Sequence, residues 1–263
     1  MKKSDTPIVK DLVLVGGGHS HVTVLKRFGM KPMPGVRLTL ICRDAHTPYS
    51  GMLPGFVAGH YSYDDAHIDL GALARFAGAR FYHSTVTSLD LTGKKVLCDN
   101  RPPVQFDLLS INTGSTPTTD HVPGATGNVV PVKPINQFLD RWEALSERAM
   151  ATSDPLRIAV VGAGAGGVEI TLAIQHRLRQ LRRAAGRNDS DIEYHLYSNT
   201  AEILPTHNAK VRATFADVLK KRGVQVHLGE PIVQVAPGRL RTAGGGEIEP
   251  DEILWVTAAG APS

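Results

Sequence analysis

The sequence lacks several features that would place it in a familiar class. It holds two cysteines among 263 residues, Cys42 and Cys98, and neither belongs to a CxxC or CxxxxC pair. A redox-active dithiol and a thiolate zinc site therefore have no support. The apolar run before the first glycines is too short for a secretory signal, and no run reaches the length of a transmembrane helix. These absences favour a reduced, cytoplasmic setting.

Charge of one sign is not in large excess either. The chain carries 29 lysines and arginines against 25 acidic residues, and the excess is spread along its length. This balance predicts a slightly basic protein without a nucleic-acid partner. The densest basic run, residues 177–187, is interpreted as the exposed face and end of a helix. A site for a polyanion is the alternative interpretation of that run.

The sequence does contain two glycine-rich turns, each placed between an apolar run and a helical pattern. Residues 12–22 read LVLVGGGHSHV, and residues 157–169 read RIAVVGAGAGGVE. A strand that ends in glycines and leads into a helix N-terminus is an arrangement that binds the pyrophosphate of a dinucleotide. The second turn fits G-x-G-x-x-G directly, whereas the first carries His21 where the third glycine belongs. Two such turns predict two cofactors that exchange electrons.

Around both turns the pattern is one of strands alternating with helices. The two strands of the first unit, residues 11–15 and 36–42, have a continuous apolar character, which is typical of a parallel sheet buried on both faces. Residues 43–63 are rich in glycine, proline, histidine and aromatics without a clear period, and we interpret them as a functional loop after a strand. Residues 80–91 are predicted to form a single strand, as are residues 104–112.

These motifs resemble a known family when they are taken in order with two exit turns, TGSTP at residues 113–117 and TAAG at residues 257–260. The family is the pyridine nucleotide-disulfide oxidoreductase superfamily, in which the first dinucleotide site holds FAD and the second holds NAD(P)H. Within it the chain looks most like the type II NADH dehydrogenase and sulfide:quinone oxidoreductase branch. Residues 43–61, RDAHTPYSGMLPGFVAGHY, are similar to the flavoprotein associated with selenide, water dikinase.

The resemblance implies an α/β fold with two Rossmann-like dinucleotide-binding domains and parallel sheets. The implied divisions are a partial FAD-binding domain (1–118), a linker and connecting helix (119–154), an NAD(P)H-binding domain (155–260) and a truncated return toward the FAD domain (261–263). Relatives then add a Gly-Asp segment that holds FAD, followed by a dimerisation or membrane-contact region. We therefore expect a C-terminally truncated chain that binds FAD weakly or not at all. Peripheral membrane contact is expected only through the missing region, and the oligomeric state stays open.

The resemblance also assigns site residues position by position. For FAD the candidates are Gly16, Gly18, His19, Ser20, His21, Asp44, Val86, Thr113 and Gly114. Asp44 substitutes for the acid that usually ends the second strand, where this chain has Cys42. For NAD(P)H the candidates are Gly162, Gly164, Gly166, Gly167, Ser198 and Gly260. Ser198 stands where NAD-preferring relatives carry an acid, so the choice between NADH and NADPH is open.

Glu169 is the candidate catalytic residue, because it would reach toward the nicotinamide. The alternative is an acid placed at a helix start by the dipole. No metal site is expected, since the H-x-H of His19 and His21 lacks a third ligand of suitable spacing. The histidines of residues 43–67 are read either as acid/base groups or as surface residues.

The function implied by the resemblance is hydride transfer from NAD(P)H to FAD and on to a small-molecule acceptor such as a quinone. The absence of a dithiol argues against a disulfide reductase. The alternative is a catalytically silent nucleotide-binding module, or a fragment of a larger flavoprotein such as one linked to selenide, water dikinase.

Overall fold

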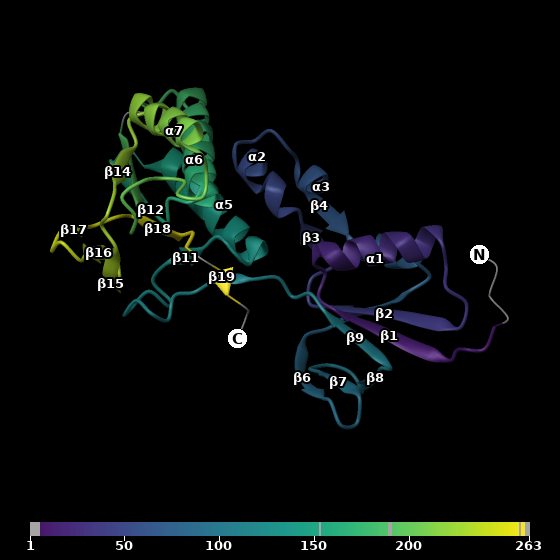
Figure 1. Cartoon of the computed structure of the whole chain (residues 1–263). Helices are drawn as coiled ribbons and strands as arrows, with labels where there is room; N and C mark the ends of the chain where they lie inside the picture. Colours follow the sequence, from purple (N-terminus) through teal and green to yellow (C-terminus); the bar gives the residue numbers. More distant parts are fainter. Residues whose placement is uncertain (1–5, 153, 189–190, 258, 261–263) are drawn as a thin grey trace. The chain divides into compact units, whose positions relative to one another are not determined.

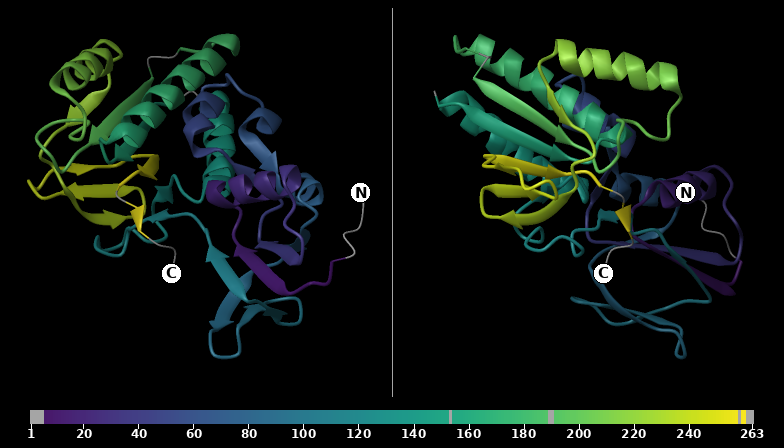
Figure 2. Two further views of the ribbon diagram at one scale, coloured as in Figure 1. Left: turned by 45° about the vertical axis from the view of Figure 1, so that its right-hand side comes forward. Right: turned by 60° about the vertical axis from the view of Figure 1, so that its left-hand side comes forward.

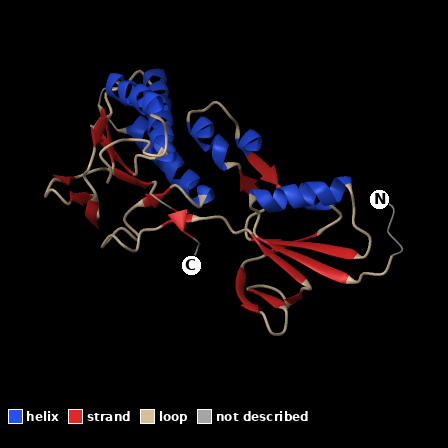
Figure 3. Cartoon of the chain, in the orientation of Figure 1, coloured by secondary structure: helices blue, strands red, loops and turns tan. Residues whose placement is uncertain are grey.

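The chain divides into two compact α/β units. The structure, a computed structural model, describes residues 6–152, 154–188, 191–257 and 259–260. The first unit comprises Met1–Tyr49 and Tyr63–Gly114, and the second comprises Ser50–Ser62 and Ser115–Ser263. Each unit has a central parallel sheet with helices on one face (Figures 1 and 3). The predicted α/β class with two parallel sheets is confirmed.

The sheet of the first unit runs in the order β5-β2-β1-β9, and its neighbouring strands are parallel. A three-stranded antiparallel sheet, β6-β7-β8, and a short β3-β4 ladder complete the unit. The elements are β1 (Lys10–Val15), α1 (His19–Met30), β2 (Val36–Cys42), β3 (His46–Pro48), α3 (Tyr63–Ala66), β4 (His67–Asp69), α4 (Leu70–Phe76), β5 (Arg80–His83), β6 (Val86–Asp90), β7 (Lys95–Cys98), β8 (Val104–Gln105) and β9 (Leu108–Ile111).

Both faces of this sheet are covered, which explains why β1 and β2 carry apolar residues on both faces. On one face Leu14 and Leu40 pack with Leu25 of α1 and Leu70 of α4. On the other face, alternate residues of the same strands form a cluster with the small antiparallel sheet; the buried members are Val13, Val15, Ile41 and Val96. Figure 1 shows α1 and the β6-β7-β8 sheet on opposite sides of β1 and β2.

Two of the predicted strands are wrong in extent. Residues 80–91 form β5 in the parallel sheet and β6 in the antiparallel one, with a break at residues 84–85. Ser84 donates to Asp99 (2.9 Å) there, and its backbone N–H donates to the Cys42 carbonyl. Residues 104–112 likewise divide into β8 and β9. A run of β-forming residues indicates strand conformation but not which sheet the strand joins.

The sheet of the second unit runs in the order β11-β18-β12-β13-β14 and is parallel. An antiparallel sheet, β15-β16-β17, and a β10-β19 ladder accompany it. The elements are η1 (Ser50–Met52), α2 (Leu53–Val57), β10 (Thr116–Pro117), β11 (Val130–Pro131), α5 (Ile135–Ala151), β12 (Leu156–Val161), α6 (Ala165–Ala184), β13 (Ile192–Tyr197), α7 (Ala209–Lys221), β14 (Gln225–His227), β15 (Ile232–Ala236), β16 (Arg239–Thr242), β17 (Glu247–Ile248), β18 (Glu252–Trp255) and β19 (Ala259–Gly260).

Helices cover one face of this sheet and the small antiparallel sheet covers the other (Figure 2). Ile158 and Val160 pack on the helical side, whereas Ala159 and Val161 pack against β15 and β16. The alternation along β12 again explains a continuous apolar run. Within the described ranges, no helix combines the length and the apolar character needed to span a bilayer.

Residues 50–62 belong to the second unit, although both flanking segments belong to the first. Leu53, Val57 and Ala58 join the core cluster that contains Phe138 of α5 and Ile174 of α6. At the base of this excursion β3 pairs with β4, and the Tyr49 N–H donates to the Ala66 carbonyl (2.9 Å). The predicted irregular loop is therefore wrong in part, because it contains a short helix with a packed apolar face.

The basic run 177–187 is only partly an exposed helix face. Arg182 is 1% exposed, and its guanidinium donates to the carbonyls of Ala149, Thr152 and Asn188 at 3.0, 3.3 and 3.0 Å. Arg187 also donates to the Thr152 carbonyl (2.9 Å). These arginines satisfy the carbonyl groups at the end of α5, which the helix itself leaves without partners.

Candidate functional site

The first glycine turn joins β1 to α1 and is closed by the end of β9. Gly16 has φ +91°, and a Cβ there would lie 2.3 Å from the carbonyl oxygen of Asn112. A side chain is therefore excluded by both conformation and space. The Gly18 N–H donates to the same carbonyl (3.2 Å), and the Asn112 N–H donates to the Val15 carbonyl (2.8 Å). Asn112 thus fixes the turn to the sheet.

Helix α1 starts directly after this turn, with Gly18 as N-cap and without a hydrogen bond from a capping side chain. No acidic residue lies in its first turn. The amide groups of His19 and Ser20 are therefore at the positive end of the helix without a competing carboxylate, which suits an anion. The His19 ring contacts Tyr49 edge-on with centroids 4.7 Å apart, and its Nε2 is buried without a partner in the described chain.

His21 occupies the position of the third glycine, and its side chain turns inward. The ring is 1% exposed, with Nδ1 2.7 Å from the Gly16 carbonyl oxygen and Nε2 2.9 Å from the Ser110 hydroxyl. Because a carbonyl only accepts, Nδ1 donates to Gly16 and Nε2 accepts from Ser110. Burial lowers the pKa of His21 despite the Gly16 hydrogen bond. A neutral imidazole therefore links the helix to β1 and β9, where a third glycine would allow direct backbone contact.

The end of β2 places Cys42 beneath the glycine turn. A Cβ at Gly17 would lie 3.2 Å from the Cys42 sulfur. Burial raises the pKa of this thiol, so it is an inert neighbour rather than a thiolate. Asp44, two residues on, is half-buried and pairs with Arg43 at 3.3 Å. Its carboxylate is accessible, and its role toward a ribose stays a prediction.

The remaining candidates of the first unit lie in two places. Thr113 is brought against the glycine turn, since a Cβ on Gly16 would lie 2.9 Å from the Thr113 Cα. Gly114 follows with φ +84° and open space around it. Val86 instead begins β6 and packs against the cluster of Val13, Val15 and Ile41. The structure thus joins Gly16 and Thr113 in one site and places Val86 under the sheet.

The second glycine turn, in the second unit, joins β12 to α6. Gly162 has φ +114°, and a Cβ there would lie 2.4 Å from the Val256 carbonyl oxygen. A Cβ on Gly167 would lie 1.7 Å from the Gly162 carbonyl oxygen, so this glycine allows the helix to approach the strand. Gly164 is the N-cap, without a side-chain cap hydrogen bond, and a Cβ on it would meet nothing within 4 Å. Gly166 is exposed in the first turn. At this turn, backbone amides and open space therefore lie next to each other.

The three other candidates of the second unit lie outside the glycine turn itself. Glu169 is exposed on α6, one turn beyond the helix start. Ser198, at the end of β13, is 5% exposed; its hydroxyl lies 2.8 Å from that of Thr200 and accepts from the Thr200 N–H (3.2 Å). Gly260 pairs with Thr116 in the β10-β19 ladder. The position after β13 therefore holds a buried hydroxyl, and no carboxylate, at residue 198.

Sequence reasoning missed Asn112, Ser110 and Thr257. Asn112 and Ser110 hold the first turn and His21, and the signal available was their place directly before the Thr-Gly exit. Thr257 follows Val256, whose carbonyl oxygen faces Gly162, and the Thr257 hydroxyl is buried without a partner in the described chain. A buried polar group without a partner calls for an explanation, and a polar ligand bound at the adjacent glycine turn would supply one.

Beside Ser198 lies a stacked pair of histidines on neighbouring strands of the sheet. His195 Nδ1 and His227 Nε2 are 3.0 Å apart, and Tyr197 stacks on His227 with centroids 4.3 Å apart. Burial lowers the pKa of both histidines and, together with Glu230, raises the pKa of Tyr197 to about 12. The His227 carbonyl accepts from the Ser198 N–H (2.8 Å), which connects the pair to the candidate site.

We predict that this pair makes the second unit less stable in acid. Below the ordinary pKa of 6.5, histidines of the unfolded chain take up protons that His195 and His227 resist in the fold. Stability should therefore fall as the pH drops from about 7.5 to about 5.5, measured by urea unfolding with tryptophan fluorescence. His227→Gln should reduce this dependence, whereas His207→Gln, at an exposed position of the same unit, should retain it. Equal pH dependence in both variants would contradict the assignment.

Comparison with known proteins identifies the family. The chain matches the pyridine nucleotide-disulphide oxidoreductase family over residues 10–261, and it belongs to that family. The resemblance of the sequence to this superfamily is thereby confirmed.

Curated relatives and solved structures agree with this membership. The chain is 25% identical over 252 residues to the NADH dehydrogenase-like protein YutJ of Bacillus subtilis, covering 94% of this chain and 64% of that protein. It is 24% identical over 290 residues to the type II NADH:quinone oxidoreductase of Haemophilus influenzae, covering 96% and 65%. The chain thus spans just under two thirds of these relatives. The structure of NDH2 from Plasmodium falciparum in complex with NADH shares its fold, with a TM-score of 0.82 at 16% identity, covering 96% of this chain and 56% of that one.

Proposed function

We propose that the chain is a flavin-dependent oxidoreductase that uses FAD on the first unit and NAD(P)H on the second. The observation that carries the proposal is the pair of glycine turns, each leading into a helix without a side-chain cap. Both turns exclude side chains where a backbone approaches closely, at Gly16 and Gly162. Both helix starts provide amide donors, and the open space beside Gly114 in the first unit and Gly164 in the second is what a pyrophosphate also requires.

In the first unit the residues fit an FAD pyrophosphate. Gly16 and Gly18 would let it reach the backbone, and the amides of His19 and Ser20 would face it; the His21 N–H donates to the Gly18 carbonyl (2.9 Å) and is not available. The buried, unpartnered Nε2 of His19 offers a further polar contact near the helix start. Thr113 and Gly114 would line the same turn, and Asp44 would bind the adenosine ribose. Bound FAD would supply the hydride acceptor and the electron relay, which no side chain provides.

In the second unit Gly162, Gly164, Gly166 and Gly167 would hold the nicotinamide nucleotide. Glu169 would approach the nicotinamide end, and Ser198 would approach the adenosine ribose. A carboxylate at the position of Ser198 would repel the 2′-phosphate of NADPH, whereas a serine hydroxyl bonded to Thr200 does not. We therefore propose that the site accepts both nucleotides.

The acceptor that we propose for the electrons is a quinone, taken from the type II NADH:quinone oxidoreductase to which the chain is similar. The domain assignment is part of the same proposal, with FAD on residues 1–118 and NAD(P)H on residues 155–260. In this proposal the protein contributes binding and orientation, and few catalytic side chains are required.

The test is an anaerobic titration of the full chain with enough added FAD to occupy the first unit, since weak FAD binding is expected. We expect NADH and NADPH each to bleach the absorbance band of the bound flavin, and a soluble quinone to restore it. Gly164→Val should abolish bleaching while flavin stays bound, because its Cβ points into open space and leaves the fold intact. Nucleotide binding without bleaching would overturn the proposal and indicate a silent nucleotide-binding module.

A further inference from the structure

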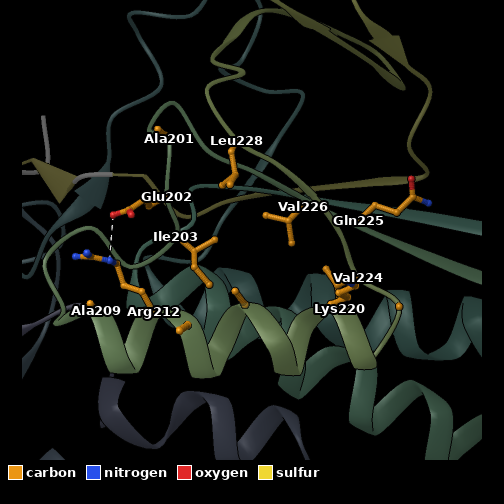
Figure 4. A pocket seen from close by; sticks show the side chains of 13 residues that line it. Ala201, Glu202, Ile203, Ala209, Arg212, Lys220, Val224, Gln225, Val226 and Leu228 are labelled. Atoms are coloured by element: carbon orange, nitrogen blue, oxygen red, sulfur yellow. Dashed lines mark ion pairs between the residues drawn. The ribbon is translucent and has the colours of Figure 1, made fainter.

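The second unit carries an apolar groove that the proposed redox chemistry does not use. It runs between α7, strand β14 and residues 201–203, and its volume is about 610 Å³. Figure 4 shows Val226 and Leu228 above the helix, with Ile203 between them and α7. This volume lies within the range of about 300 to 1,000 Å³ that is typical of small-molecule sites.

The groove exists because α7 presents small side chains toward β14. Ala209, Ala213 and Ala216 recur at helical spacing along one face of the helix and line the groove. Opposite them, Val224, Val226 and Leu228 line the other wall, and the methyl groups of the alanines are too short to fill the space between. Leu228 remains 43% exposed at the mouth of the groove. The packing leaves an open, apolar channel along the helix.

The two ends of the groove differ in charge. At one end Arg212 Nε lies 3.0 Å from Glu202 Oε2, so the two charges cancel (Figure 4). At the other end Lys220 lines the groove and forms no ion pair with any residue that the structure describes. The groove is therefore apolar along its length with one uncompensated cation at one end.

This distribution favours a small amphiphile over an added peptide strand. Strand β14 is the edge of its sheet but contains only three residues, Gln225–His227, so it offers few free backbone groups for pairing. From Ala209 to Lys220 the helix rises about 16 Å, a length that suits an extended chain of methylene groups. A single cation at the end of such a channel matches a single anionic head group.

We propose that this groove binds an amphiphilic anion, with its hydrocarbon chain along Ala213 and Ala216 and its carboxylate beside Lys220. The proposal does not rest on flavin or nicotinamide binding, because none of the lining residues is among the candidates for those two sites. It assigns to the second unit a ligand of a different chemical class from a dinucleotide.

The experiment is isothermal titration calorimetry of the full chain with decanoate, below its micellar concentration. We expect saturable binding with one site per chain. Ala213→Phe should reduce binding at least about tenfold by filling the groove, and Ala216→Met provides a second, smaller obstruction. Thr214→Phe, the next residue on the same helix but outside the groove, should bind as the wild type does. Absence of saturable binding, or equal loss in the Ala213 and Thr214 variants, would overturn the proposal.

Neighbouring lysines test the position of the head group. Lys220→Gln should weaken decanoate binding by about two- to fivefold, which is the effect expected for loss of an exposed ion pair. Lys221→Gln also removes one positive charge, but outside the groove, and should have little effect. Binding of decanol should not respond to either variant. An equal effect of both lysine variants would indicate nonspecific attraction and contradict the assignment. NADH binding, measured alongside, should be unchanged in all these variants.

Discussion

Replacing Gly167 with valine is expected to destabilise the second unit by about 3 kcal/mol or more and to abolish nicotinamide nucleotide binding. A Cβ at this position would lie 1.7 Å from the Gly162 carbonyl oxygen, so α6 must move away from β12. The movement would open the contact of Val168 and Ile170 with the core and displace the amides of the first turn. Urea unfolding measures the first effect, and titration with NADH measures the second.

The matched control is Gly164→Val in the same turn. Gly164 has extended backbone angles, φ −72° and ψ −176°, and a Cβ there would meet no atom within 4 Å. We expect this variant to lose nucleotide binding and no more than about 1 kcal/mol of stability, because valine is a poorer N-cap than glycine but meets no clash. If Gly167→Val binds NADH normally, the turn is not the nucleotide site; if Gly164→Val unfolds like Gly167→Val, the steric argument is wrong.

Introducing a charge at Val57 is expected to unfold the second unit, although this residue lies between segments of the first. Val57 is 0% exposed and belongs to the core cluster around α5 and α6. An aspartate there would bury an unpaired carboxylate, at a cost of about 3 kcal/mol or more. The measurement is direct because both tryptophans of the chain, Trp142 and Trp255, lie in the second unit, so their fluorescence follows its unfolding.

Val13→Asp provides the comparison. Val13 is also 0% exposed, but it packs in the sheet of the first unit. We expect Val57→Asp to lower the urea midpoint of the tryptophan transition much more than Val13→Asp does. The milder Val57→Ala should give an intermediate shift if the aspartate variant fails to accumulate. A larger shift for Val13→Asp would show that residues 50–62 do not stabilise the second unit.

Much of the architecture could be predicted from sequence because its signals are local. Leu12 to Val15 and Ile158 to Val161 are apolar where a parallel strand is buried on both faces, and each is followed by glycines and a helical period. The sheet or helix against which a segment packs is not determined by that segment's own residues. The division of residues 80–91 between two sheets, and the packing of α2 on α6, depend on partners distant in sequence.

The candidate sites show the same limit. Glycine favours a tight turn because of its own conformational freedom, so Gly16 and Gly162 could be found from the sequence. His21 departs from the first motif, and its role follows only from its partners, Gly16 and Ser110. Arg182 belongs to a run that the sequence presents as surface charge, and only the position of the α5 carbonyls shows why it is buried. A sequence shows which residues carry a charge, but it does not show which groups those residues bond to in the fold.

Residues 50–62, which pack in the second unit although both flanking segments belong to the first, have a consequence for synthesis on the ribosome. Their apolar members, Leu53 and Val57, emerge long before α5 and α6, the helices that bury them. At ordinary elongation rates the delay is on the order of ten seconds, which is long compared with the collapse of a small domain. The β3-β4 ladder closes the base of the excursion, so the first unit can form with this arm exposed. The nascent chain therefore presents a transient apolar segment, which a chaperone could recognise until the second unit is complete.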